Sequence, residues 1–268
     1  MLTFLFWNTD HNAVSRHVVD LAIRHDVDFV LLAECAIPPA DLLQAINHKR
    51  SSYHYVPSNY ERIVTLLRFS PQFTNILLDT PNLLLRRVKM PEREEFLLAA
   101  AHLPSRLWED AASLNSECEE LAKIIRDQET SQGHERTIVI GDLNLNPFEP
   151  GIVRAPGFHA VMSKRVAGRG SRVVHGRRYP FFYNPMWNYF GDENPPSGTY
   201  YYRGSGHLSY FWNIFDQVLI RPDLLHYLPD HPVNILTTTD SQPLLRGNEL
   251  PDRVKVSDHL PILFTINL

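Results

Sequence analysis

Cysteine is scarce in this sequence, and long hydrophobic runs are absent. Cys35 and Cys118 are the only two cysteines among 268 residues, which is too few for a disulfide framework. No run approaches the ~20 apolar residues of a membrane-spanning helix. The N-terminal segment is apolar too briefly for a secretory signal and lacks a basic leader. We therefore expect a cytoplasmic protein without a membrane span, in which both thiols stay reduced.

The chain also lacks an overall positive charge. Its formal net charge is −4, so it does not carry the global positive field of many nucleic-acid binders. Carboxylates gathered at a metal site would contribute to this negative total. Any basic surface that meets a polyanion must therefore be local.

Linker sequence is missing as well. The chain contains no Gly/Ser run, no block of like charge and no internal repeat. Its hydrophobic share of 44% is ordinary for a protein with a packed core. Because the polar motifs described below lie near both termini and must meet at one site, we predict a single domain over residues 1–268.

The hydrophobic pattern predicts strands and helices in a mixed order. Residues 2–8 and 27–33 are apolar runs typical of buried strands, and an amphipathic helix is expected over 14–25 between them. Further helices are expected over 38–47 and 107–128. The other expected strands are 53–57, 63–69, 75–79, 83–89, 96–102, 137–141, 215–220 and 262–266. Because no helix separates the strands from 53 to 102, the order favours a two-sheet α/β sandwich over a predominantly parallel sheet.

Polar residues stand at the ends of four apolar runs. Strand ends of a packed sheet are where sites for phosphate and metal chemistry are usually built. Hard oxygen ligands, amide donors and one imidazole are what a divalent cation and a phosphodiester need. Since no Cys/His cluster accompanies them, the set predicts Mg²⁺ or Mn²⁺ rather than structural zinc. These residues are Asn8, Glu34, Asp142, Asn144, Asp258 and His259.

Glu34 and Asn8 each have a simpler alternative interpretation. A carboxylate that follows an apolar run is costly to bury unpaired, so Glu34 needs a cation or a solvated strand end. Asn8 supplies an amide beside the metal, or is a turn residue, because Thr9, Asp10 and Asn12 favour helix caps. Only in combination with the other motifs does the metal interpretation prevail.

His259 is the candidate base of the set. Water is a poor nucleophile at neutral pH, and an imidazole can take its proton. A partner carboxylate should fix the other ring nitrogen. Asp142 and Asn144 are two residues apart, so in an extended segment both side chains project on one face. The alternative interpretation of these two residues is that they belong to an Asx-rich turn before Pro147.

Six motifs carry a resemblance to a known family. They are FWN, LLAE, AAHL, GDLNLNP, FDQVLI and SDHLPI, in this order from Phe6 to Ile262. The chain thereby resembles the endonuclease/exonuclease/phosphatase superfamily, which includes pancreatic deoxyribonuclease, abasic-site endonucleases, inositol-polyphosphate phosphatases and bacterial sphingomyelinases. The resemblance implies a four-layer α/β/β/α sandwich of two mixed β-sheets flanked by helices. It also implies a metal-dependent phosphoric-ester hydrolase.

The resemblance implies a role for each matching residue. One carboxylate should hold the imidazole of the base, and a second histidine should contact the scissile phosphate. By these roles the metal ligands are Glu34, Asn8 and Asp258; the catalytic residues are His259, Asp216, His102, Asp142 and Asn144; and Asn144 and His102 also contact substrate.

Residues 150–214 form a long segment between two of the motifs, and long loops are usually functional. It is rich in basic residues and in aromatics, a combination that holds phosphate backbones and stacks bases. The alternative is a satellite core of aromatics with solvated arginines around it. The predicted phosphate contacts are Arg169, Arg172, Arg177 and Arg178.

The substrate is the remaining choice. We expect a Mg²⁺- or Mn²⁺-dependent nuclease that hydrolyses DNA or RNA through a His-activated water. A small-molecule or lipid phosphoesterase is the alternative, although the Trp-Cys-Asp-Arg signature of the inositol phosphatases and the signal peptide of the secreted sphingomyelinases are missing. A catalytically silent binding module is the third hypothesis, disfavoured by the intact polar set. The sequence assigns no protein partner or oligomeric state.

Overall fold

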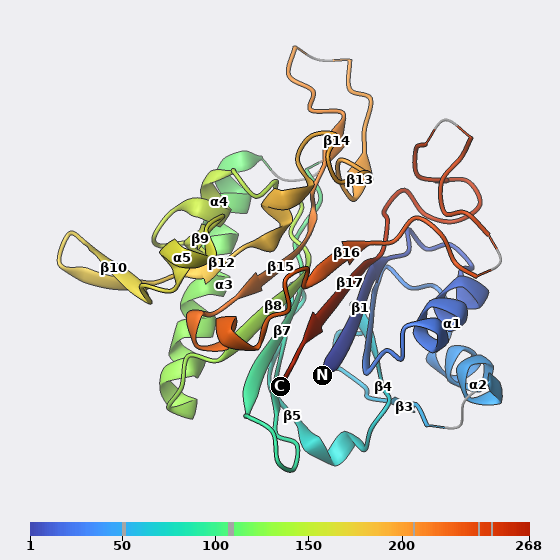
Figure 1. Cartoon of the computed structure of the whole chain (residues 1–268), viewed down its shortest axis with the longest axis horizontal. Coiled ribbons are helices and arrows are strands. Elements are labelled where there is room, and N and C mark those ends of the chain that lie inside the picture. Colours follow the sequence, from blue (N-terminus) through green and yellow to red (C-terminus); the bar gives the residue numbers. More distant parts are fainter. Residues whose placement is uncertain (50–51, 107–109, 206, 241, 248) are drawn as a thin grey trace.

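Two mixed β-sheets lie at the centre of the molecule, and helices cover their outer faces (Figure 1). The computed structural model describes residues 1–49, 52–106, 110–205, 207–240, 242–247 and 249–268. The expected four-layer sandwich of helices, two mixed sheets and helices is confirmed. No helix in these ranges is long and apolar enough to cross a membrane.

The first sheet contains both ends of the chain. Its outer strands pair antiparallel, whereas β1 and β2 run parallel to each other. In the order of the sheet, the strands are β16 (Val233–Ile235), β17 (Ile262–Ile266), β1 (Leu2–Asn8), β2 (Phe29–Ala33), β4 (Ile63–Leu67) and β3 (His54–Tyr55).

The second sheet packs against the first, with β8 and β15 in contact with β1. In it β7 and β8 run parallel, as do β12 and β9, and the other pairs are antiparallel. In the order of the sheet, the strands are β5 (Thr74–Asp79), β6 (Leu83–Val88), β7 (Phe96–His102), β8 (Thr137–Asp142), β15 (Asp216–Ile220), β12 (Phe182–Tyr183) and β9 (Ala160–Val161).

The helices lie on opposite outer faces of the sandwich (Figure 1). The helices α1 (Ser15–Arg24) and α2 (Pro39–Lys49) lie beside the first sheet, and α3 (Ala111–Gln132) lies on the outer side of the second. The N-cap of α3 is Asp110, whose side chain accepts a hydrogen bond from the Ser113 amide. The shorter helical segments are α4 (Pro150–Val153), α5 (Lys164–Ala167), η1 (Pro71–Phe73), η2 (Pro185–Tyr189) and η3 (Pro222–Tyr227).

Two hydrophobic cores hold these layers together. The larger lies between the sheets, where Phe4 stacks on Phe29 with ring centroids 4.4 Å apart and Phe96 meets both rings edge-on. The smaller lies between the second sheet and α3 and includes Cys118. Burial raises the pKa of the Cys118 thiol, which keeps it protonated as a small core residue. Cys35 is also a free thiol.

The expected elements agree closely where the apolar runs are long. The strands over 2–8, 96–102 and 262–266 have the expected bounds. The expected helix over 107–128 begins instead at Ala111 and ends at Gln132, and its positions 107–109 lie outside the described residues. The expected strand over 53–57 is reduced to the two residues of β3.

The segment 150–214 is more ordered than the sequence predicts. We expected an irregular region, but it supplies β9 and β12 to the second sheet and adds two hairpins. The hairpin strands are β10 (Ser171–Val174) with β11 (Arg177–Pro180), and β13 (Tyr200–Tyr201) with β14 (Trp212–Asn213). Strands this short show no readable hydrophobic period. Some of the aromatics are core, as expected for a satellite core; Phe182 is fully buried, whereas Tyr202 and Phe211 are exposed.

A buried ion pair joins Arg221, directly after β15, to Glu129 of α3, and Arg221 also contacts the segment 150–214. The side chains of Arg221 and Glu129 are both almost fully buried. Arg221 Nε donates to Glu129 Oε1 at 2.7 Å, and Arg221 Nη2 donates to Glu129 Oε2 at 3.0 Å. The Arg221 guanidinium also lies 3.7 Å above the ring of Phe182 and donates to the carbonyl of Pro180. Since removing one partner of such a pair leaves an uncompensated buried charge, this contact fixes β11 and β12 to the body.

Candidate active site

The carboxyl ends of four strands meet at one edge of the sandwich. Because β1 and β2 are parallel, Asn8 pairs with Ala33, directly before Glu34. In the same way β7 and β8 place His102 opposite Asp142. In Figure 1 this edge lies at the end of β1 that is away from the N-terminus. Parallel pairing in each sheet thus brings together side chains from distant parts of the sequence.

Asn8 joins the two sheets at this edge. Its side chain is 2% exposed, and its Nδ2 donates to Asp142 Oδ2 at 3.0 Å and to Glu34 Oε1 at 3.3 Å. The C-terminal loop is locked onto the same strand, because Ser257 Oγ donates to the Asn8 carbonyl at 2.8 Å. A single amide therefore positions two carboxylates from different sheets.

Glu34 points into a cleft and stays ionised. Its backbone is in the left-handed region, with φ of 48°, and its side chain is 31% exposed. His102 Nε2 lies 3.2 Å from Glu34 Oε1, and His11 Nε2 lies 3.4 Å from Oε2. The hydrogen bond from His102 outweighs burial and holds the pKa of Glu34 at about 2. The carboxylate is thus charged at all physiological pH values.

Asp216 and His259 form a buried pair. His259 Nδ1 lies 2.8 Å from Asp216 Oδ2, and Asp216 is fully buried. This contact leaves Nε2 facing Asp142 and Asp258, whose oxygens lie 3.8 and 3.9 Å away. Burial alone would lower the pKa of His259, but the carboxylates of Asp216 and Asp142 raise it to about 10. An imidazole held in this way has one fixed nitrogen and one nitrogen available for proton transfer.

The GDLN motif turns its side chains inward. Gly141 is required here, because a Cβ at this position would lie 1.9 Å from the carbonyl oxygen of Ala101 on β7. The close approach of two strands explains this glycine. Asp142 Oδ1 accepts from the Asn144 amide at 3.0 Å, and Asn144 Nδ2 donates to the Leu103 carbonyl at 2.9 Å. One N–H of the Asn144 side chain is left for a ligand.

A carboxylate cluster faces the same edge, and it includes a residue that sequence reasoning missed. Burial raises the pKa of Asp10, and the charge of Glu34 raises it further. Burial also raises the pKa of Asp258; His259 lowers it, whereas Asp10 and Glu34 raise it again. Mutual repulsion among carboxylate oxygens suits a hard divalent cation. We interpreted Asp10 as a capping type, although its spacing from Asn8 was a usable signal.

A second group of side chains could also hold a metal ion. Asp142, Asp216 and His259 offer ligand atoms that all lie within 4.8 Å of one another. The Nδ1 atom of His259 is already bonded to Asp216, however, and both oxygens of Asp142 accept hydrogen bonds. Of the two groups, the carboxylate cluster around Glu34 has more free oxygen atoms.

Two clefts open beside these residues. One has a volume of about 450 Å³ and is lined by Glu34, His102, His11 and Arg62, among others. The other, of about 340 Å³, is lined chiefly by aromatic side chains together with Arg106 and Asn144. Its aromatic residues are Tyr200, Tyr202, Tyr210 and Phe215. The reacting groups therefore lie between a polar cleft and an aromatic one.

Tyr200 and Arg106 are further neighbours that the sequence did not reveal. The ring of Tyr200 lies 4.7 Å from that of His259 and stacks on Phe215 at 5.2 Å. Burial raises the pKa of Tyr200 to about 12, so its hydroxyl stays protonated. Arg106 Nε donates to the Asn144 carbonyl at 2.8 Å. Both contacts join residues far apart in the chain, which no local pattern announces.

The structure brings together eight of the predicted site residues and leaves four apart. The eight at the edge are Asn8, Glu34, His102, Asp142, Asn144, Asp216, Asp258 and His259. The other four are Arg169, Arg172, Arg177 and Arg178. They lie on or just before the β10–β11 hairpin, which projects from another side of the molecule (Figure 1). Their predicted contact with substrate therefore cannot be part of the cluster at the strand ends.

Comparisons with known proteins agree with this geometry. A model of the Endonuclease/Exonuclease/phosphatase family matches residues 5–259. A search of curated proteins found no match. A solved structure of the Neisseria 3' phosphatase NExo bound to product DNA hairpin is similar, with a TM-score of 0.58, 17% sequence identity and 100% of both chains covered.

Two further solved structures are similar over the whole chain. An AP endonuclease from Archaeoglobus fulgidus has a TM-score of 0.59, 16% identity and 100% coverage of both chains. TDP2 of D. rerio complexed with single strand DNA product has a TM-score of 0.53 and 20% identity, over 100% of this chain and 99% of that one. At these identities the likeness extends to the fold, a two-sheet α/β sandwich.

Proposed function

Because the chain belongs to the endonuclease/exonuclease/phosphatase family, we propose that it is a metal-dependent phosphodiesterase that hydrolyses nucleic acid. The observation that carries this proposal is the buried His259–Asp216 pair beside an ionised Glu34. A fixed imidazole, a charged carboxylate and amide donors at one edge are the groups that hydrolysis of a phosphodiester needs. We further propose that residues 1–268 act as a single domain, since the site draws residues from both ends of the chain.

His259 is the proposed general base. Its Nδ1 atom is held by Asp216 at 2.8 Å, so Nε2 accepts the proton of the attacking water. The charge of Asp216 then stabilises the imidazolium that forms. Asp142 and Asp258 face Nε2. Neutralisation of their charge by the bound cation would therefore lower the pKa of His259 toward the range in which the imidazole acts as a base.

Glu34, Asn8 and Asp258 are the proposed metal ligands, and we add Asp10 to them. Their oxygen-rich donor set fits Mg²⁺ or Mn²⁺. When bound, such a cation supplies charge stabilisation at the phosphate. Burial raises the pKa of Asp10 and of Asp258, and the charge of Glu34 raises both further; a cation bound between these carboxylates would relieve both effects, which supports this assignment.

Asn144, His102 and Asp142 complete the proposed site. Asn144 has one side-chain N–H left to donate to a phosphate oxygen, because the other bonds to Leu103. His102 donates through Nε2 to Glu34 and lies where it can contact the scissile phosphate. Asp142 accepts from the Asn8 side chain and from the backbone N–H of Asn144, so it orients the amide of Asn8, fixes the backbone at Asn144, and is proposed to orient the water or leaving group near them.

A nucleic acid is the proposed substrate class. Two of the similar structures, Neisseria NExo and D. rerio TDP2, are complexes with product DNA, which supports this class for the present chain. A small-molecule or lipid phosphoesterase of the same fold is the alternative, and a silent binding module is the third hypothesis.

A panel of substrates tests the proposal. Plasmid DNA, single-stranded DNA, RNA and phosphoinositide vesicles are incubated with the full-length protein and Mg²⁺ or Mn²⁺, next to the His259→Ala variant. We expect metal-dependent hydrolysis of at least one nucleic acid, lost in the variant. Hydrolysis of phosphoinositides alone would favour the lipid phosphoesterase, and no hydrolysis of any substrate would favour the silent module.

A further inference from the structure

Positive charge is concentrated in one part of the chain. Residues 150–190 contain seven arginines and lysines and no aspartate or glutamate, in a protein whose formal net charge is −4. Six of the seven lie on α5 or on and around the β10–β11 hairpin, and all six are exposed. These six are Lys164, Arg165, Arg169, Arg172, Arg177 and Arg178. We name residues 164–180 the arginine ribbon.

The ribbon is a defined structure and projects from the body (Figure 1). Its strands pair antiparallel from Ser171 with Pro180 to Val174 with Arg177. His175 and Gly176 form the two-residue turn, with φ of 48° and 76°. Positive φ at both central residues is the type I′ geometry, whose twist matches that of the strands it joins. The ribbon thus presents its charges in a fixed arrangement.

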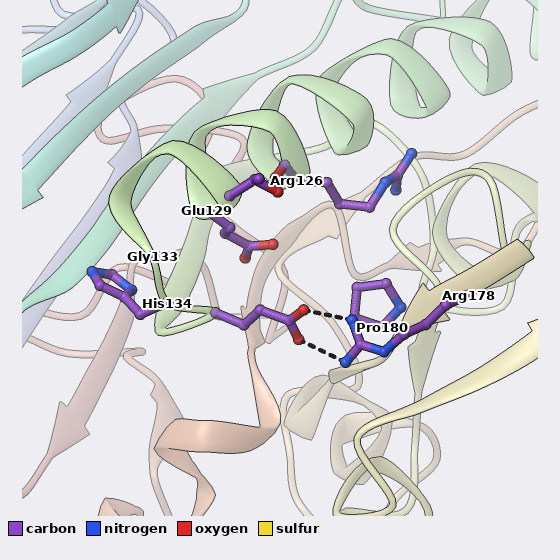
Figure 2. A pocket seen from close by; sticks show the side chains of 8 residues that line it. Arg126, Glu129, Gly133, His134, Arg178 and Pro180 are labelled. Carbon is purple, nitrogen blue, oxygen red and sulfur yellow. Dashed lines mark hydrogen bonds and ion pairs between the residues drawn. The ribbon is translucent and has the colours of Figure 1, made fainter.

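Two of the arginines anchor the ribbon. Arg178 reaches across a pocket of about 400 Å³ and forms two hydrogen bonds, of 2.6 and 3.2 Å, with the carboxylate of Glu135 just after α3 (Figure 2). Arg172 Nε donates to His159 Nε2 at 2.8 Å. Burial, together with the charge of Arg172, lowers the pKa of His159 to about 4, so His159 stays neutral and accepts this bond. The two contacts, one from each strand of the hairpin, hold it against the body of the protein.

The other four basic residues have no such partner. Within the part of the chain that the structure describes, no ion pair joins Lys164, Arg165, Arg169 or Arg177 to a carboxylate. Like charges on a short ribbon repel one another. Because nothing in the described fold compensates this repulsion, a bound polyanion would relieve it.

We propose that the arginine ribbon is a second contact for nucleic acid and binds its phosphate backbone. This contact is separate from the edge of the sandwich that carries the proposed catalytic residues around His259, which we name the catalytic edge. The proposal rests on the proposed function, because the ribbon would hold a strand whose other part lies at the strand ends. Guanidinium groups match phosphate geometry with two hydrogen bonds. A two-stranded β-ribbon is also narrow enough to follow a groove of duplex DNA.

The surface chemistry of the ribbon favours nucleic acid over an acidic protein. Val173 is the one large apolar side chain recorded as exposed among residues 164–180, all of which are described. Protein interfaces draw most of their affinity from buried aromatic and apolar anchors. On the ribbon, six of the ten exposed residues are basic and none is acidic, and such a surface gains affinity from the release of counterions from a phosphate backbone.

The anchoring contacts sharpen the proposal to particular residues. Arg169 and Arg177 carry uncompensated charge at the ribbon, so they should contribute most to binding. The charge of Arg178 is matched by Glu135, so its removal should change the salt dependence of binding less than removal of Arg177 does.

Binding is measured by fluorescence anisotropy on the full chain in EDTA, so that hydrolysis plays no part. The probes are a labelled duplex of about 30 base pairs and a labelled strand of about 6 nucleotides, titrated over a range of salt. The test variant is Arg169→Glu with Arg177→Glu. The control is Arg16→Glu with Lys49→Glu, an equal charge change at two exposed residues of α1 and α2 in the opposite helical layer.

We expect the ribbon variant to bind the long duplex on the order of tenfold more weakly at ~0.1 M salt, with a salt slope smaller by about 2. The loss should be smaller for the short strand, and the control should bind within about twofold of the parent protein. A thermal melt confirms that each variant is folded. Arg177→Gln should flatten the salt slope more than Arg178→Gln.

Three outcomes would overturn the proposal. They are an unchanged salt slope in the folded ribbon variant, an equal loss in the control variant, or competition by polyglutamate as strong as that by unlabelled duplex. Because the assay does not depend on hydrolysis, a protein that binds DNA through the ribbon but cleaves no substrate would refute the proposed function and leave the ribbon standing.

Discussion

The catalytic edge and the arginine ribbon arrange charge in opposite ways. At the edge, Asp142, Asp216 and His259 are nearly or fully buried and bonded to one another or to amides. On the ribbon, Arg169 and Arg177 are exposed and lie in a segment without carboxylates. Buried charges act at short range in a low dielectric, whereas exposed charges act on an extended partner and are screened by salt.

This difference separates what each region can contribute. A side chain fixed by several contacts can hold a reacting atom in place, so changes at the edge should alter turnover. A solvated arginine contributes mainly to encounter and binding, so changes on the ribbon should alter affinity and its salt dependence. The following predictions test this separation, starting with the largest expected effect.

Removal of the cation should abolish hydrolysis without unfolding the protein. The carboxylates of Asp10, Glu34 and Asp258 repel one another, and none of the three belongs to either hydrophobic core. Glu34→Gln should raise the metal concentration needed for half-maximal rate by at least about tenfold. Activity is measured against Mg²⁺ concentration and folding by circular dichroism. Full activity in EDTA would contradict the metal assignment.

Alanine substitutions at two glycines, one at the catalytic edge and one in the arginine ribbon, test how tightly each region is packed. Gly141→Ala places a Cβ against the carbonyl of Ala101 and should cost about 3 kcal/mol of stability. Gly176→Ala meets no atom within 4 Å, but its φ of 76° makes alanine strained by about 1 kcal/mol. Chemical denaturation of both variants checks this order. Equal costs would show that the edge is no more tightly packed than the ribbon.

Asp216→Asn should reduce turnover by about 10- to 100-fold, less than loss of the imidazole itself. Among the carboxylates, Asp216 raises the pKa of His259 most strongly. Its replacement by a neutral amide should therefore lower that pKa. Because the base must be unprotonated, the rise of rate with pH should begin at lower pH in the variant. Single-turnover rates across pH measure both effects. A profile with an unchanged midpoint would argue against Asp216 as the partner of the base.

The smallest effect is expected from the anchor of the ribbon. Arg178 and Glu135 are partly exposed, and exposed pairs contribute little to stability. Glu135→Gln should therefore leave the melting temperature nearly unchanged, while it frees the charge of Arg178 and strengthens binding of duplex DNA by about twofold. Weaker binding would indicate that this pair sets the orientation of the ribbon rather than merely compensating its charge.

Part of the catalytic edge could be predicted from sequence, because several of its residues stand directly at the ends of apolar runs. Asn8 and Glu34 follow β1 and β2, and the parallel pairing of these strands brings them together. The partnership of Asp216 with His259 spans 43 positions, and only the family resemblance indicated it. Asp10 was missed because its position before a helix has an equally good local explanation as a cap.

The segment 150–214 was harder to predict for a different reason. Its strands β9 and β12 have two residues each, too few to show a period. They are held instead by contacts from other parts of the chain, such as the guanidinium of Arg221, which lies 3.7 Å above the ring of Phe182. The basic residues of this segment lie close together in the sequence, but no sequence signal placed them away from the strand ends.

The most direct test of the account is single-turnover cleavage of labelled DNA by His259→Ala at saturating Mg²⁺. The control is His48→Ala, an exposed histidine on α2. Without the base, we predict a rate lower by about 10²–10⁴-fold, with the affinity for DNA within about threefold and the fold intact. The control should cleave at the parent rate. A folded His259→Ala protein that cleaves nearly as fast as the parent would contradict the central claim.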